Sequence, residues 1–74
     1  MTKLPQVKPK DVLRSLLKEG FEVNRKVGSH VYLKHPDGRS TSISIHPKPL
    51  AKGTLRAILK QTQIPLEKFL ELLK

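Results

Sequence analysis

The tripeptide Gly28-Ser29-His30 holds the side chain best suited to acid–base chemistry in this chain. Histidine both accepts and donates a proton near neutral pH, and the glycine permits a sharp turn just before it. Three cations, at Arg25, Lys26 and Lys34, lie within a few residues. A phosphodiester drawn to these cations would meet a proton-transfer group. We therefore interpret His30 as a candidate for phosphate chemistry. The alternative is that His30 is an exposed loop histidine without a role.

Basic residues also gather around the start of a predicted helix, at Lys48, Lys52 and Arg56. The free N–H groups of a helix N-terminus carry partial positive charge and attract phosphate. The chain has a net charge of +9, and residues 24–60 hold eight basic residues against one acidic residue. Such a concentration is typical of a surface for a polyanion, most often nucleic acid, although a solvated basic surface would carry the same charge. The residues expected to bind RNA are Lys26, Ser29, Lys48, Lys52 and Arg56.

Aromatic residues are too few for a platform on which several bases stack. Phe21 and Phe69 fall in predicted core positions, which leaves Tyr32 as the one aromatic side chain expected to face outward. This composition favours contacts with the nucleic-acid backbone over base readout on a single-strand platform.

The other two histidines are weaker candidates. His35 stands at the end of a predicted strand beside Pro36, and His46 stands at the end of the next strand beside Pro47. We interpret His35 as a strand-end residue and leave open whether His46 supports His30 or contacts RNA. Separations of five and eleven residues between the three histidines match no common metal-ligand motif. We expect no metal and no other cofactor, and chemistry carried by histidine and cations.

The length and composition of the chain limit which structural elements can position these residues. The chain has 74 residues, which is room for one domain. It has no cysteine, which excludes disulfides and thiolate zinc sites and fits a reducing compartment. No apolar run approaches the ~18 residues of a membrane span, and residues 1–10 lack the apolar segment of a secretory signal. We predict a cytoplasmic protein without membrane contact, with a single domain over residues 1–74 and a loose arm over residues 1–8.

Hydrophobic periodicity predicts the element order α-β-β-β-α-α. A helical stripe of valine and leucine occupies residues 9–19, between Pro9 and a capping Gly20. Alternating apolar residues predict strands at 21–27 and 30–35 and a third at 42–46, which short turns join into an antiparallel meander. A second helix begins near residues 52–54, and Pro65 opens a last short helix.

Three strands with one apolar face require a cover, which the helices supply. We thus expect an α+β fold, with a three-stranded antiparallel sheet and helices on one face, like the double-stranded RNA-binding domain. Val27 is expected to continue the inward phase of Phe21 and Val23. The expected core consists of Val12, Leu13, Leu16, Leu17, Phe21, Val23, Val31, Leu33, Ile43, Ile45, Leu55, Ile58, Leu59, Phe69 and Leu70.

These motifs, in this order and over nearly the whole chain, resemble the HicA family of toxins from prokaryotic toxin–antitoxin pairs. The matching segments are the helix end Glu19-Gly20-Phe21, then Gly28-Ser29-His30, then His35-Pro36-Asp37-Gly38-Arg39, then Ile45-His46-Pro47, and finally residues 52–61 and 69–73. The chain departs from the family at Gln61-Thr62-Gln63, where an Ala-Gly helix end is frequent, and at Ser44, where proline is frequent.

The resemblance implies a fold like the double-stranded RNA-binding domain, ribonuclease activity on mRNA, and neutralisation by a HicB-type antitoxin protein. It also implies that His30 is the catalytic histidine. The chain would then be a metal-independent endoribonuclease in which Lys26, Lys52 and Arg56 hold the RNA backbone. Two alternatives stay open: a basic module that binds RNA without cutting it, and a protein-interaction domain, which predicts no salt-dependent RNA affinity.

Overall fold

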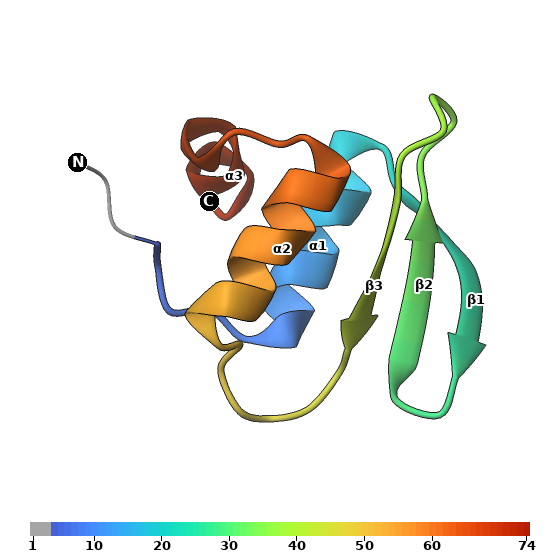
Figure 1. Ribbon diagram of the computed structural model, residues 1–74, viewed down its shortest axis with the longest axis horizontal. Helices are drawn as coiled ribbons and strands as arrows, with labels where there is room; N and C mark the ends of the chain where they lie inside the picture. Colours follow the sequence, from blue (N-terminus) through green and yellow to red (C-terminus); the bar gives the residue numbers. More distant parts are fainter. Residues whose placement is uncertain (1–3) are drawn as a thin grey trace.

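The computed structural model describes residues 4–74 and has the predicted element order (Figure 1). The elements are α1 (Pro9–Glu19), β1 (Glu22–Val27), β2 (His30–Lys34), β3 (Ser40–Ser44), α2 (Lys52–Thr62) and α3 (Leu66–Leu72). Within this described part, the helices and the three-stranded antiparallel sheet confirm the predicted α+β fold. No helix of residues 4–74 is long and apolar enough to span a membrane.

The first helix ends at a left-handed glycine, as predicted. Pro9 occupies the first turn, and Leu16 lies on the buried stripe. Gly20 has φ 108°, which lets its N–H donate to the carbonyl of Leu17 at 3.2 Å, while the N–H of Phe21 donates to that of Leu16 at 3.0 Å. These two bonds form a Schellman motif. The motif fixes Phe21 against the helix that it follows.

The second helix ends in the same motif, with glutamine in the place of glycine. Gln63 has φ 55°, its N–H donates to the carbonyl of Lys60 at 3.2 Å, and the N–H of Ile64 donates to that of Leu59 at 3.1 Å. A side chain in the left-handed region costs roughly 1–2 kcal/mol. The departure at Gln61-Thr62-Gln63 therefore keeps the helix end but adds strain to it.

A tight turn joins the first two strands of the sheet, whose order is β1-β2-β3. Gly28 and Ser29 form this turn, which the pair of Val27 and His30 closes. Gly28 has φ 58°, and a positive φ at the first turn residue alone is the pattern of a type II′ hairpin. Along β2 the residues alternate between exposed and buried, so His30 lies on the face away from the core.

The first strand differs from the prediction because a bulge shifts its phase. The register changes between Val23 and Arg25, which leaves Asn24 as an extra residue on β1. Beyond the bulge, Val27 lies opposite His30, on the open face of the sheet. The inward phase predicted for Val27 is therefore wrong.

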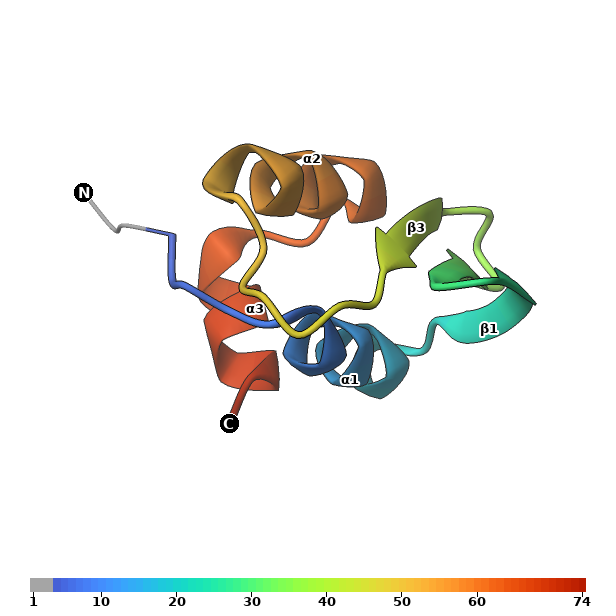
Figure 2. The same ribbon diagram turned by 90° about the horizontal axis from the view of Figure 1, so that it is seen from below.

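The helices cover one face of the sheet but leave β1 outside the cover (Figure 2). Both α1 and α2 contact β3, whereas every residue of β1 is exposed. Val23, predicted in the core, is 50% exposed for this reason, and Leu17 is 46% exposed because it lies outside the buried stripe of α1. The predicted core residues that are only partly buried are Leu13, Ile45 and Leu70.

The core lies between the helices and the strands β2 and β3. The predicted core residues that are buried are Val12, Leu16, Phe21, Val31, Leu33, Ile43, Leu55, Ile58, Leu59 and Phe69. The prediction missed Val7, Leu50 and Ile64, which are buried although they lie in connecting segments. The N–H of Leu50 donates to the carbonyl of Val7 at 2.8 Å. The arm is thus not loose at Val7, and its residues 1–3 lie outside the described residues.

The third strand begins two residues earlier than its apolar alternation predicts. Ser40 pairs with Lys34 and Thr41 pairs with Leu33, so the ladder starts directly after the turn. Ile45 lies beyond the end of β3. The strand ends beside the turn that precedes His30 (Figure 1).

Candidate functional site

His30 is the first residue of β2 and is exposed at the lower end of that strand in Figure 1. Its cross-strand neighbours are Val27 on β1 and Ser44 on β3. Val31, next in the chain, is buried on the opposite face. The imidazole therefore stands on a backbone paired on both sides, with its ring toward solvent.

The chain that leaves β3 is held against the turn before His30. The N–H of Ile45 donates to the carbonyl of Ser29 at 2.7 Å. His46 follows Ile45 directly and is exposed. A second imidazole thus lies at the same end of the sheet as His30, and Ser29 contributes its backbone to holding that end together.

Cations surround the start of α2 at this same end. Residues 45–51 lead from β3 to the first turn of α2, and α1 also begins at this end (Figure 1). The N-cap of α2, Ala51, gives no side-chain hydrogen bond, and the first turn holds no acid, so its N–H groups keep their partial positive charge. Lys48, Lys52 and Arg56 are exposed here, the last two one helical turn apart.

Lys26 is the predicted RNA-binding residue that the fold separates from His30. It pairs with Val31, whose side chain faces the helices, whereas His30 belongs to the opposite phase of β2. It is exposed because the helices leave β1 uncovered. The fold thus brings Ser29, Lys48 and Lys52 to one end with His30, and puts Lys26 on the other face of the sheet.

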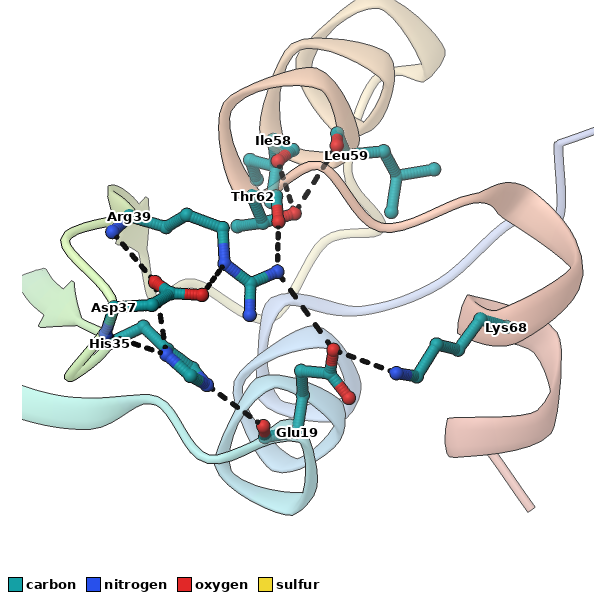
Figure 3. A network of polar contacts seen from close by, with 8 residues as sticks. All are labelled: Glu19, His35, Asp37, Arg39, Ile58, Leu59, Thr62 and Lys68. Atoms are coloured by element: carbon teal, nitrogen blue, oxygen red, sulfur yellow. Dashed lines mark hydrogen bonds and ion pairs between the residues drawn. The ribbon is translucent and has the colours of Figure 1, made fainter.

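His35 follows β2 at the end opposite His30, and its ring lies within a cluster of polar contacts (Figure 3). Its Nε2 atom donates to the carbonyl of Glu19 at 3.2 Å, and its Nδ1 atom accepts from the N–H of Asp37 at 3.1 Å. Its ring packs edge-on against Phe21, with centroids 5.0 Å apart. Both ring nitrogens are bonded to backbone groups, which agrees with the interpretation of His35 as a strand-end residue.

Arg39 is the centre of this second cluster, which we call the clamp: Glu19, His35, Asp37, Arg39, Thr62 and Lys68. Its Nε atom lies 2.7 Å from a carboxylate oxygen of Asp37, and its NH1 atom donates to the carbonyl of Thr62 at the end of α2. The guanidinium also lies over the ring of Phe21, 5.2 Å from the centroid. The side chain is only 18% exposed.

Glu19 extends the clamp to the last helix. Its carboxylate lies 3.0 Å from the Nζ atom of Lys68 on α3 and 3.9 Å from Arg39. The clamp therefore joins the turn between β2 and β3 to the ends of α1 and α2 and to α3. From sequence alone, Pro36-Asp37-Gly38-Arg39 indicates a turn, and this turn pattern does not predict that Arg39 is drawn inward. The one available signal was an arginine two residues after an aspartate in a turn.

The carboxyl group of Asp37 is stabilised in its charged form. The N–H of Arg39 donates to it at 3.0 Å, and this bond, followed by the guanidinium of the same residue, holds the pKa of Asp37 below its usual value of 3.8.

Within residues 4–74, no three histidine or acidic side chains gather closely enough to hold a metal ion.

Comparison with protein families identifies one match. The sequence model of the family described as the HicA toxin of bacterial toxin–antitoxin systems matches residues 9–64, well over half of the chain. A comparison with individual curated proteins finds no match. The matched segment runs from the start of α1 through the sheet to the left-handed end of α2, and it includes every residue of the clamp except Lys68. The chain therefore belongs to the HicA family of toxins of bacterial toxin–antitoxin systems.

Proposed function

We propose that this toxin is a metal-independent endoribonuclease that cleaves mRNA, with His30 as its proton-transfer group. The observation that carries the proposal is the position of His30, an exposed imidazole at the same end of the molecule as the uncapped start of α2. The cations Lys48, Lys52 and Arg56 surround that helix start. RNA attracted to them would bring its phosphates to the histidine.

The reaction that suits a lone histidine is transfer within the RNA strand. His30 removes the proton of a ribose 2′-OH, and the oxygen attacks the adjacent phosphorus in line with the leaving 5′-oxygen. The bond from phosphorus to that oxygen breaks, water supplies the proton that the leaving oxygen takes, and the products are a 2′,3′-cyclic phosphate and a 5′-hydroxyl end. No metal enters this scheme.

The cations stabilise the charge that develops on the phosphate. Lys52 and Arg56 lie one turn apart on an exposed helix edge, so they can contact successive phosphates of one strand. The free N–H groups of the first turn of α2 add partial positive charge beside them. Such fixed charges stabilise a transition state without reorganising during the reaction. Lys26 would act from the other face of the sheet and hold RNA that passes around the β1 edge.

Cleavage of a long mRNA in EDTA tests the enzyme proposal. Wild-type protein is expected to cut, and His30→Gln is expected to cut at least about 100-fold more slowly, since a positioned proton-transfer group contributes roughly 10²–10⁴-fold. His46→Gln, made in parallel, tests the role left open for the second exposed imidazole at this end. Cutting by His30→Gln at the wild-type rate would reject His30, and a free 3′-hydroxyl on the product would reject attack by the 2′-oxygen.

Binding without cleavage is the second candidate, and the cations around α2 favour it equally. It predicts that wild-type protein and His30→Gln bind RNA with the same affinity and that neither cuts it. If the purified wild-type protein binds RNA in a salt-dependent way and shows no detectable cleavage, the proposed enzyme is rejected and the protein is a basic RNA-binding module.

We further propose that a HicB-type antitoxin protein neutralises the toxin by covering His30 with an acidic surface. A net charge of +9 favours an acidic partner. Charge reversal by Lys52→Glu and Arg56→Glu is expected to weaken binding of the antitoxin, measured directly by calorimetry. Lys74→Glu, at the far end of the chain, is the control. Unchanged affinity after reversal at both positions would place the interface elsewhere.

A further inference from the structure

The open face of the sheet, which no helix covers, holds a row of three residues beside His30. Arg25 on β1, Tyr32 on β2 and Ser42 on β3 lie opposite one another in register. The next row toward the turn is Val27, His30 and Ser44. Because Tyr32 is two residues from His30 on the same strand, the two side chains share a face and their Cα atoms lie roughly 7 Å apart.

The bulge in β1 brings arginine to the tyrosine. Without the bulge, the register set by Val23 and Leu33 would continue, with Asn24 opposite Tyr32 and Arg25 opposite the buried Val31. With it, the guanidinium of Arg25 lies over the tyrosine ring, 5.2 Å from the centroid. This cation–π contact keeps the ring and the guanidinium together on the surface.

The β3 side of the tyrosine ring is left open. Each residue of β3 on this face is a serine, at positions 40, 42 and 44, and serine is too short to cover an aromatic ring. A groove lies there, which Tyr32 lines together with Asn24, Lys34, Ser40 and Ser42. It extends past Leu33 and Thr41 to Gln61 near the end of α2. Tyr32 is 37% exposed. A flat group can therefore lie against the ring with hydroxyl groups and an ammonium group at its rim.

We propose that Tyr32 and Arg25 form a stacking subsite for one nucleobase of a single RNA strand. The tyrosine ring and the guanidinium plane both stack on any base, and the serines of β3 offer hydrogen bonds to its edge. Lys34, on the same face, balances the charge of a phosphate. Glu22 is the one acidic residue that the register of residues 4–74 places on this face, against Arg25 and Lys34, so the charge favours RNA over a basic partner.

The position of this subsite next to His30 rests on the proposed function. A base held on Tyr32 would belong to a nucleotide next to the bond that is cleaved beside His30, because one nucleotide spans about the separation of two alternate strand residues. One exposed aromatic side chain cannot form a platform on which several bases stack, but it can stack on a single base. RNA affinity would then depend on bases as well as on charge.

The tyrosine itself reports on the subsite, because the chain has one tyrosine and no tryptophan. We would titrate His30→Gln with a short single-stranded oligoribonucleotide and with the same oligomer carrying abasic positions, and record tyrosine fluorescence. The intact oligomer is expected to quench the fluorescence and to bind about tenfold more tightly than the abasic one. Equal affinity of the two oligomers without quenching would overturn the subsite, since charge alone would explain binding.

Substitution at Tyr32 gives an independent readout with labelled RNA. Tyr32→Phe is expected to keep the affinity, whereas Tyr32→Leu is expected to lower it about tenfold while keeping the salt dependence, because the phosphate contacts stay. Equal affinity of the leucine and phenylalanine variants would count against stacking. Absence of cleavage by wild type with quenching intact would overturn the proposed function and leave the subsite standing.

Discussion

The Nε2 atom of His35 lies 3.2 Å from the backbone carbonyl oxygen of Glu19, which is 16 residues earlier in the chain. This bond joins the turn between β2 and β3 to the last turn of α1. His30, five residues before His35 in the chain, makes no such contact within the described residues and stands exposed at the other end of β2. His35 thus contributes to stability, whereas the proposed function assigns chemistry to His30.

Replacement of the two histidines by alanine should separate these roles. His35→Ala is expected to lower the free energy of unfolding by about 1–3 kcal/mol, because it leaves backbone groups without partners and removes the contact with Phe21. His30→Ala is expected to change it by less than about 0.5 kcal/mol. Urea denaturation measures both, and an equal loss in the two variants would contradict the division.

Gly20 and Gly53 should respond oppositely to alanine. At Gly20, φ is 108° and an added Cβ would lie 3.0 Å from Nε2 of His35, so Gly20→Ala is expected to cost about 1–3 kcal/mol. At Gly53, an added Cβ meets nothing within 4 Å, and alanine should keep or raise stability, since it favours the helix by up to about 1 kcal/mol. Thermal unfolding of the two variants provides the measurement. A Gly20→Ala protein as stable as Gly53→Ala would refute the steric argument.

Gln63→Gly should stabilise the protein. Gln63 holds φ 55° at the end of α2, where glycine is free of strain. We expect a gain of about 1 kcal/mol in the free energy of unfolding. Lys60→Gly is the control, since glycine inside the same helix is expected to cost about 1 kcal/mol. A loss of stability in both variants would show that the left-handed end carries no strain.

Asp37 should make stability depend on acid pH. Its pKa is lowered in the folded protein by the N–H of Arg39 and then by the guanidinium, so the charged form stabilises the fold above the unfolded pKa of 3.8. That contribution is lost as pH falls below 3.8 through the lower folded pKa. We expect Asp37→Asn to be less stable than wild type at pH 7 and the difference to shrink below pH 3.8. A difference that stays constant between pH 7 and 3 would exclude this linkage.

Salt dependence should reveal which cations meet phosphate. Lys52→Ala and Arg56→Ala are each expected to reduce the slope of log affinity against log salt by about 0.7, the value for one contact on a single strand. Lys74→Ala should leave the slope unchanged, because Lys74 lies in the C-terminal segment beside Glu71. Identical slopes for all three variants would argue against the start of α2 as the phosphate site.

Periodicity predicted the elements because they follow local rules. Pro9, Gly20 and the Gly28-Ser29 turn set the bounds of α1 and of the first hairpin where predicted. Whether a residue is buried depends on whether another element of the fold packs over it. Val23 has the expected phase, yet it is exposed because no helix reaches β1. Leu50 and Ile64 lie outside any periodic segment, so no pattern marked them as core.

The candidate site was predictable only in part for the same reason. His30 follows a turn signal and lies on the predicted face of β2. The bulge at Asn24 has no sequence signal that alternation would detect, so Lys26 was expected beside His30 and Arg25 was not expected beside Tyr32. Arg39 was counted among the eight basic residues of positions 24–60, whereas long-range contacts with Glu19 and Thr62 draw it into the clamp.

The clamp and the His30 end lie at opposite ends of the sheet, and this separation bears on how the protein can evolve. Residues 46–49, between β3 and α2, are all exposed, and within residues 4–74 no hydrogen bond or ion pair joins them to the clamp. Under the proposed function, substitutions in this loop would alter which surface meets RNA or an inhibitor without weakening the bonds that join the helices to the sheet. New specificities can thus arise by single mutational steps in a protein of 74 residues that has little stability to spare.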